Sequence, residues 1–177
     1  MNLQYKQLLP TDFDANSRVW IYQSNRLFSW GEALQVEEIL NSFVEGWKSH
    51  GTPVKGFATL FFGQFVVLMA DERATGVSGC STDSSVRMIK ILEETFGVTL
   101  FDRRLLAFVV KDKIQLLPLE QLPFALENRF IDADTLYFNN LVATRAELDN
   151  QWIIPIRESW LHQRLQLPSS PEQPVNG

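Results

Sequence analysis

The stretch from Ser78 to Arg87 is the part of the sequence whose residue types suggest chemistry as well as packing. It reads Ser-Gly-Cys-Ser-Thr-Asp-Ser-Ser-Val-Arg and runs directly into a helical pattern. Free amides and the positive end of a helix dipole at such a start favour an anion or a thiolate. Cys80 is therefore a candidate nucleophile, with Asp83 as a candidate helper. A buried, inert cysteine among ordinary helix caps is the alternative explanation.

A cysteine nucleophile requires a base, and the chain has two histidines, His50 and His162. His50 lies at the end of a helical pattern over residues 31–50. The expected topology places this end and the loop before Cys80 at the same sheet edge, together with Arg18 and Lys111. His50 is therefore the candidate base. Interaction with the negative end of the helix dipole is its alternative role.

The glycine and serine residues around position 80 also invite comparison with phosphate-binding loops. The sequence contains neither G-x-x-x-x-G-K-[ST] nor G-x-G-x-x-G, and no lysine follows residues 76–79 at the spacing needed to reach a phosphate. ATP hydrolysis of the P-loop kind is therefore excluded, whereas binding of an anion without hydrolysis stays open. The candidate ligand-binding residues in and near this stretch are Arg18, Ser81, Ser84 and Arg87.

Amide side chains gather at the ends of two expected strands. Directional hydrogen bonds from such amides would orient a small polar ligand, and turn or capping roles explain the same residues. A further candidate surface is aromatic, near the C-terminus, where packing against the sheet is the alternative. The residues at these amide-rich strand ends are Gln23, Asn25, Arg26, Asn139 and Asn140, and those of the aromatic group are Trp152, Trp160 and His162.

Metal and cofactor chemistry has little support in the sequence. The two histidines are far apart in sequence, and there is no H-E-x-x-H motif. Asp132 and Asp134 are expected to stabilise a turn and not to bind a metal. The single cysteine, Cys80, cannot form an intrachain disulfide or a thiolate zinc site. We expect no metal and no cofactor.

The composition is that of a soluble globular protein. Of 177 residues, 45% are hydrophobic and 21% charged, and the net charge of −5 disfavours nucleic acid as a partner. No run approaches the ~18 apolar residues of a membrane helix, and the N-terminal residues do not resemble a secretion signal. A cytoplasmic location with no membrane association is expected.

The elements expected from periodicity follow the order β-α-β-β-α-β. Strands are expected at 19–22, 54–62, 65–69, 105–110 and 114–117, with a two-residue turn at Gly63-Gln64. The first helix is capped by Ser29 and has an apolar pattern from Leu34 to Trp47; the second starts at Ser81, Thr82 or Asp83 and stops at Gly97. This order matches an α+β, ferredoxin-like (split βαβ) antiparallel sheet with two helices on one face.

The other face of that sheet must also be covered, because strands 54–62 and 65–69 are apolar on both sides. A C-terminal helical and irregular region is one candidate, with helices at 119–130, 145–152 and 157–165 and a strand at 136–138. A homodimer is the other. The expected organisation is an irregular segment at residues 1–16, a single domain at 17–167 and a disordered tail at 168–177.

Four segments resemble an uncharacterised bacterial family of single-domain proteins that are often labelled "ABC transporter ATPase". They are residues 17–26, 78–87, 138–142 and 158–162, and the resemblance covers residues 17–165. The label implies nucleotide binding. The resemblance carries over no catalytic residues.

Three functions follow from these observations. The first is a non-enzymatic binding or interaction module, because no acid, base and nucleophile clearly converge and aromatic residues are abundant. The second is a thiol-dependent, acyl-transfer type of enzyme using Cys80. The third is nucleotide or anion binding without hydrolysis. The partner would be a small polar or anionic ligand, another protein or a second copy of the chain.

Overall fold

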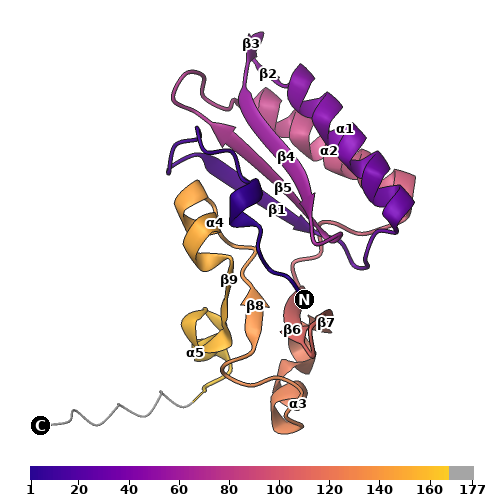
Figure 1. Cartoon of the computed structure of the whole chain (residues 1–177), viewed down its shortest axis with the longest axis vertical. Helices are drawn as coiled ribbons and strands as arrows, with labels where there is room; N and C mark the ends of the chain where they lie inside the picture. The colour runs from indigo at the N-terminus through magenta and orange to yellow at the C-terminus, as the bar shows by residue number, and fades with distance from the viewer. Residues whose placement is uncertain (168–177) are drawn as a thin grey trace, which may run out of the picture. The chain divides into compact units, whose positions relative to one another are not determined.

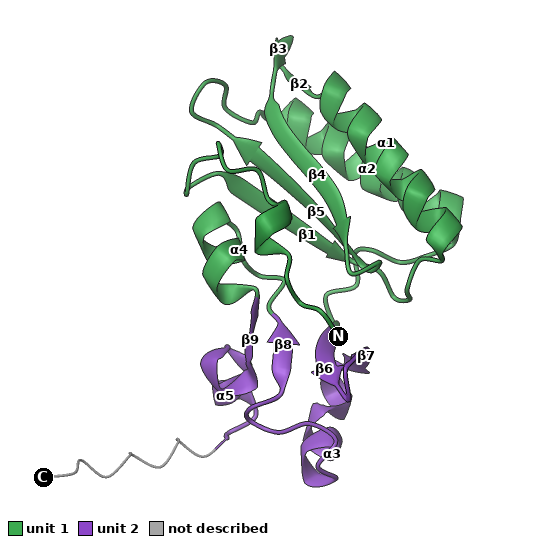
Figure 2. Ribbon diagram, viewed as in Figure 1, with its two compact units in different colours: residues 1–105, 139–152 green, residues 106–138, 153–177 purple. Residues whose placement is uncertain are grey.

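The computed structural model describes residues 1–167, which form a mixed α+β fold with antiparallel sheets (Figure 1). The chain divides into two compact units (Figure 2). Unit 1 contains residues 1–105 and 139–152, and unit 2 contains residues 106–138 and the segment that starts at residue 153. The expected disordered tail at 168–177 lies outside the described residues.

Unit 1 is built on a three-stranded sheet in the order β1-β5-β4. The strands are β1 (Arg18–Gln23), β4 (Lys55–Phe61) and β5 (Phe65–Asp71), and both pairings are antiparallel. Every residue of the central strand β5 is buried. The three predicted strands are confirmed, with ends that differ by at most two residues.

The β4–β5 turn lies one residue earlier than predicted. Its central residues are Phe62 and Gly63, with φ values of 54° and 63°, and the Gln64 amide donates to the Phe61 carbonyl at 3.0 Å. Glycine adopts positive φ without a steric penalty, which explains Gly63 at this position. Gln64 is the buried residue that leads into β5 rather than part of the turn itself.

Helices α1 (Trp30–Gly46) and α2 (Gly79–Phe96) cover one face of this sheet (Figure 1). The predicted Ser29 cap is confirmed as a full capping box with Glu32. Helix α1 ends at Gly46 and not at residue 50, because the chain turns into a short hairpin of β2 (Lys48–Ser49) and β3 (Thr52–Pro53). Gly97 closes α2 in the left-handed conformation, as its position predicts.

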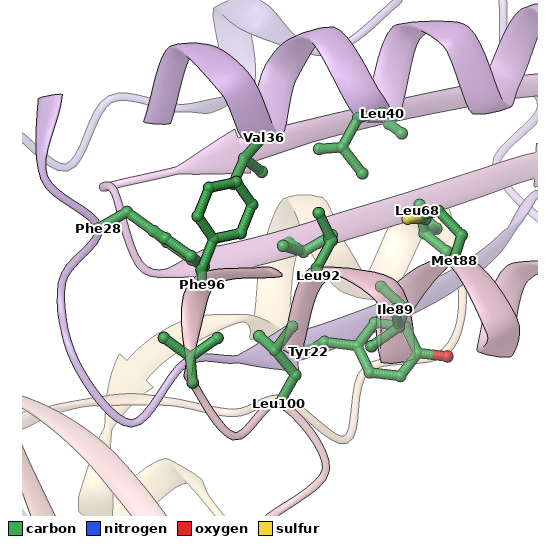
Figure 3. Packing of buried hydrophobic residues seen from close by; sticks show 13 residues of the cluster. Tyr22, Phe28, Val36, Leu40, Leu68, Met88, Ile89, Leu92, Phe96 and Leu100 are labelled. Carbon is green, nitrogen blue, oxygen red and sulfur yellow. The ribbon is translucent and has the colours of Figure 1, made fainter. Parts of the chain in front are cut away.

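The core between helices and sheet is aliphatic and aromatic. Val36 and Leu40 of α1 and Ile89 and Leu92 of α2 are fully buried over Leu68 of β5 (Figure 3). These helix positions recur at spacings of three and four, and they are the positions that amphipathic periodicity selects. The local pattern of the two helices therefore determines which side of each helix faces the sheet.

The opposite face of the sheet is covered by the chain itself. Tyr5 precedes a 3-10 turn at Lys6–Leu8, and helix α4 (Arg145–Gln151) ends just before Trp152 (Figure 1). The Tyr5 ring lies 4.7 Å from that of Trp152 and 5.8 Å from that of Phe61 on the sheet. The predicted C-terminal cover is thus present in α4 and Trp152, whereas the contribution of the N-terminal segment was not predicted.

The strand at residues 105–110 forms as predicted but does not join the first sheet. It is β6 (Leu105–Val110), which heads a second sheet in the order β7-β6-β8-β9. The other strands are β7 (Lys113–Pro118), β8 (Leu136–Phe138) and β9 (Ile153–Pro155). At the edge of β1 the Val19 amide instead donates to the Ala143 carbonyl, and Arg18 forms an isolated bridge with Thr144.

Unit 2 is small and has its own apolar cluster, which includes Phe108, Leu122, Tyr137, Ile156 and Leu161. The helices expected at 119–130 and 157–165 are much shorter than predicted. They are α3 (Leu122–Glu127) and α5 (Leu161–Arg164), each preceded by a 3-10 turn, at Leu119–Gln121 and Ile156–Glu158. The 3-10 turns take up the first residues of both predicted helices, and α3 already ends at Glu127.

Candidate functional site: the groove between α1 and α2

Helix α2 is capped by Ser78, three residues before the earliest predicted cap. Ser78 is extended, and its hydroxyl accepts a hydrogen bond from the Ser81 amide at 3.3 Å. The prediction that Ser81, Thr82 or Asp83 caps the helix is therefore wrong. The Ser78 amide donates to the Ser49 hydroxyl at 3.2 Å, which fixes the chain before the helix and sets its start at Gly79.

The hydroxyl groups that follow this cap are used by the helix itself. Each donates to a backbone carbonyl three or four residues earlier, at 2.7 to 3.1 Å. This pattern is common for serine and threonine inside helices, and it uses the only donor of each hydroxyl. The group comprises Ser81, Thr82, Ser84 and Ser85. The serine-rich composition that suggested a ligand site is explained by the helix backbone.

Trp47 explains why small residues are required on this side of α2. Its indole nitrogen donates to the Ser81 carbonyl at 3.0 Å, and its ring is 2% exposed. Ser81 and Ser85 are themselves buried, so larger side chains would displace the helix from the sheet. On the other side, a methyl group at Gly56 would lie 2.7 Å from the Trp47 ring. Close packing around one tryptophan therefore selects serine and glycine.

A groove of about 490 Å³ runs between the two helices. Phe43, Trp47 and Met88 contribute apolar surface, while Ser42 and Gly46 of α1 are small and leave the space open. The remaining lining residues are Ile39, Ser84, Arg87 and Ile91. Two of the residues predicted from sequence as ligand-binding, Ser84 and Arg87, therefore line this groove.

Arg87 is the charged residue of the groove. It is exposed, and within residues 1–167 its guanidinium forms no hydrogen bond or ion pair. The Ser84 hydroxyl, in contrast, donates to the Ser81 carbonyl at 2.7 Å. The groove therefore offers an apolar floor and one available cation.

Large apolar side chains are exposed on α1, just before it and on α2, and one of them, Ile91, lines this groove. Trp30 at the first position of α1 is 83% exposed, and Leu34 one turn later is 54% exposed. Leu27 before the helix and Ile91 on α2 are 57% and 53% exposed. Leu34 was expected on the buried side of α1, yet the core side of the helix is formed by Val36 and Leu40. Sequence reasoning did not select Trp30, although a tryptophan directly after a helix cap is a recognisable signal.

The proposed thiol chemistry is not assembled around Cys80. The cysteine is exposed at the second position of α2, and Asp83 is exposed within the same helix. His50 occupies the turn between β2 and β3 with a φ of 49°, so its expected place at the end of α1 is wrong. The Ser49–Ser78 hydrogen bond brings the neighbouring chain segments together. No hydrogen bond joins Cys80, His50 and Asp83 in the part of the chain that the structure describes.

Gln23 and Asn140 lie together because their side chains hydrogen-bond to each other, and not because they surround a ligand site. The side-chain Nδ2 of Asn140 donates to the side-chain Oε1 of Gln23 at 2.9 Å. The Oδ1 of Asn140 accepts from the Trp152 indole at 3.0 Å. Gln23 also donates to the Leu105 carbonyl at 2.9 Å. The Asn139 amide donates to the Gln151 carbonyl at 3.2 Å. This chain of amides fastens β1 to the segment around α4, which is a structural role.

Asn25 and Arg26 fasten the end of α2. Asn25 accepts from the Thr99 amide at 2.9 Å, and Arg26 donates to the Phe96 carbonyl at 2.6 Å. Arg26 also forms a two-pronged ion pair with Glu32, with both distances 2.9 Å. Hydrogen bonds from Arg26, and then from the Ser29 backbone, lower the pKa of Glu32 to about 2. These predicted ligand residues therefore already have partners within the protein.

The remaining charged cluster of unit 1 is also internally paired. Arg18 lies 4.9 Å from the Trp20 ring and forms a long ion pair with Glu72 at 3.6 Å. Buried Asp71 accepts hydrogen bonds from Arg73, which hold the pKa of its carboxyl well below the ordinary range. Lys55 donates to the Asp12 carbonyl at 2.7 Å. The network holds the N-terminal segment against the sheet.

The residues of the aromatic surface predicted near the C-terminus belong to two different units. Trp152 is fully buried in unit 1, which confirms the packing alternative for this residue. Trp160 belongs to unit 2 and donates to the Tyr137 hydroxyl at 3.2 Å. Among residues 1–167, no three His, Cys, Asp or Glu side chains are placed to hold a metal ion.

Comparisons with protein-family models, curated proteins and solved structures found no match for this chain. Across the residues that the structure describes, none of the helices combines the length and apolar character needed to cross a bilayer. The candidate site that the described residues support best is the α1–α2 groove, together with the exposed apolar side chains of α1.

Proposed function

We propose that this protein is a non-enzymatic interaction module that binds another protein surface through the α1–α2 face. The observation that carries the proposal is the exposure of Trp30 and Leu34 on α1 together with an apolar α1–α2 groove lined by exposed Ile91. Large exposed apolar patches on globular proteins usually mark interaction sites, and tryptophan is among the residues that contribute most to interfaces. Within residues 1–167 no hydrogen bond joins Cys80, His50 and Asp83, which favours this reading over catalysis.

Site-specific photo-crosslinking tests the proposal in the purified protein and in cells. A photoreactive amino acid at Leu34 should give covalent protein adducts, and the yield should fall when Arg87 is changed to Glu. The same group at Leu141, which is 63% exposed and belongs to neither helix, serves as the matched control. Equal, background-level adducts at Leu34, Ile91 and Leu141 would reject the proposed surface.

A thiol-dependent enzyme is the second candidate, favoured by the exposure of Cys80 in the first turn of α2. Positive potential at a helix start stabilises a thiolate. Cys80 should then react with a thiol reagent at neutral pH faster than free cysteine does. A Cys80→Ser, Gly76→Cys variant moves the thiol to an exposed loop and is the control. Reaction of Cys80 no faster than free cysteine removes this candidate.

Anion or nucleotide binding, which the family resemblance implies, has one supporting observation in the unpaired guanidinium of Arg87. Thermal-shift measurements with ATP and inorganic phosphate test it, because a ligand that binds the folded state alone raises the midpoint. A shift that is lost in Arg87→Ala would support the idea. No shift at millimolar ligand would count against both this function and the implied family label.

We also infer a ferredoxin-like origin for unit 1 and a cytosolic setting. The element order β1-α1-β4-β5-α2 and the sheet order β1-β5-β4 support the first inference. Residues 142–144, which reach the edge of β1, would take the place of the fourth strand. The exposed thiol of Cys80 supports the second, because such a thiol is stable to oxidation only in a reducing compartment. Strong hydrogen-exchange protection of the Val19 amide is expected.

A further inference from the structure

One row of residues on α1 changes from large to small along the helix. Positions spaced by four, from residue 30 to residue 46, are Trp30, Leu34, Glu38, Ser42 and Gly46. Such a row is one of the ridges that helices use when they pack against each other. The N-terminal half of this row is a ridge of exposed apolar side chains. The C-terminal half is low and borders the groove.

The ridge and the low half are complementary when a second copy of the same row is turned end to end. A two-fold axis near Glu38 brings Trp30 of one copy to Gly46 of the other, and Leu34 to Ser42. The two ends lie about 24 Å apart along a helix with a rise of 1.5 Å per residue. Rows of this kind align when helices cross at about 50°. Each contact then forms twice, as two-fold symmetry requires.

We propose that the chain forms a homodimer through α1, with Trp30 of each copy inserted into the α1–α2 groove of the other. This inference rests on the proposed interaction function and names a second copy as the partner. The groove of about 490 Å³ has the volume to accept an indole ring. Gly46, Trp47, Ser84 and Arg87 are among its lining residues.

A cation–π contact would favour Trp30 of a second copy as the occupant. Arg87 is an unpaired cation at the groove, and the inserted Trp30 would present the negative face of its ring to it. Glu38 lies at the expected two-fold axis, where it would meet its own copy. That repulsion opposes the dimer, so Glu38→Gln should tighten association.

The available area is near the lower limit for a specific small dimer. Helices of 17 and 18 residues are each about 26 Å long. With helix diameters of about 10 Å, the two-helix face covers on the order of 500 Å² in projection. The accessible surface over side chains is larger than this projection and approaches the ~600 to 800 Å² per partner of specific interfaces.

Sedimentation equilibrium of the full chain tests the dimer. The wild type should dimerise, and Trp30→Ala and Gly46→Leu should each raise the dissociation constant by about tenfold or more, as for a central anchor. A Cβ at Gly46 would meet no atom within 4 Å in the single chain, so Gly46→Leu is expected to fill the groove and to leave the fold intact. Gly76→Leu, equally unobstructed, is the control and should leave dimerisation unchanged.

Mixing the two variants separates this geometry from other modes of association. Trp30→Ala retains an open groove and Gly46→Leu retains the tryptophan, so the mixture should form a heterodimer more readily than either variant self-associates. A wild type that stays monomeric up to about 1 mM, a concentration that detects very weak pairing, overturns the inference. Dimerisation unaffected by Trp30→Ala does so as well. Leu34 adducts to other proteins alongside a monomeric wild type would leave the proposed function standing and reject the homodimer.

Discussion

The residue type at some positions is determined by the space that a fixed neighbour leaves, and Trp47 is such a neighbour. Trp47 is held by a hydrogen bond to the Ser81 carbonyl and by ring contacts with Phe43 and Trp20, at centroid distances of 5.1 and 6.2 Å. Because the ring is fixed on several sides, it cannot move away from a neighbour that grows. Gly56 is the residue that this fixed ring requires.

Gly56→Ala should lower the free energy of unfolding by about 1 to 3 kcal/mol, the usual cost of overpacking. The added methyl would lie 2.7 Å from the Trp47 ring, so the ring or strand β4 must shift. Urea denaturation monitored by tryptophan fluorescence measures the change. Gly31→Ala, where a methyl meets nothing within 4 Å, is the control and should be neutral or slightly stabilising. Equal effects of the two substitutions would contradict the role assigned to Trp47.

The start of helix α1 and the end of helix α2 are held by side-chain hydrogen bonds. The capping box at Ser29 is readable from sequence, because Ser-x-x-Glu is a local signature. The Glu32 carboxylate of this box also holds Arg26, whose guanidinium reaches the Phe96 carbonyl at the end of α2. One ion pair therefore links the start of one helix to the end of the other.

The stability from this ion pair should disappear in acid. The pKa of Glu32 falls from 4.5 to about 2 on folding, so the contribution is complete above pH 4.5 and is lost as the pH falls towards 2. Glu32→Gln should destabilise the protein at pH 7, and its difference from wild type should vanish near pH 2. Chemical denaturation across this range gives the comparison. Glu45→Gln, on an exposed site of the same helix, should show no such dependence, and a pH-independent loss in Glu32→Gln would refute the account.

At the scale of the molecule, the sheet of unit 1 is buried on both faces by its own chain. Tyr5 closes the second face, with its ring against Phe61 and Trp152 and its hydroxyl donating to the Leu148 carbonyl at 2.6 Å. Residues at the N-terminus and residues after position 145 thus meet over the same strands. Because strands β4 and β5 are apolar on both sides, both faces of the sheet must be shielded from water, and this arrangement covers the second face.

Replacing Tyr5 should therefore have a large effect. Tyr5→Ala should cost about 3 to 5 kcal/mol in the free energy of unfolding, because it leaves a cavity in an aromatic cluster. Tyr5→Phe keeps the ring and leaves the Leu148 carbonyl without its partner, for about 1 to 3 kcal/mol. Leu8→Ala, at a site that is 63% exposed in the same segment, should change stability by less than about 0.5 kcal/mol. A mild Tyr5→Ala effect, similar to that of Leu8→Ala, would show that this segment does not close the sheet.

The raised pKa of the Tyr5 phenol predicts that the folded protein loses stability at alkaline pH. Burial, and to a smaller extent the charge of Asp149, raises its pKa from 10.0 to about 12. The neutral ring is the form that packs, so its contribution is complete below pH 10 and is lost as the pH rises towards 12. Wild type should lose more stability than Tyr5→Phe between these values. Identical alkaline profiles of the two proteins would contradict burial of the phenol.

The sequence predicted part of the candidate site. Ser84 and Arg87 were selected as ligand-binding residues and do line the groove, although they were selected for a different reason. Trp30 was missed and Leu34 was expected to be buried, because periodicity identifies an apolar side of a helix without saying how much of it the sheet covers. The amide residues Gln23 and Asn140 were recognised as unusual, and their partners proved to be each other.

Local patterns alone were sufficient for helices α1 and α2, for the β4–β5 hairpin and for the β6–β7 hairpin, because their signals lie within a few residues of one another. Tertiary structure decided which sheet β6 joins, which segments cover the second face and where α2 begins. Those choices depend on edges, volumes and hydrogen-bond partners contributed by residues far apart in the chain, such as Tyr5 with Trp152 and Trp47 with Ser81. The candidate site depends on tertiary structure in the same way. The sequence determines which residues share a row on α1, whereas tertiary packing determines that Trp30 and the α1–α2 groove stay exposed.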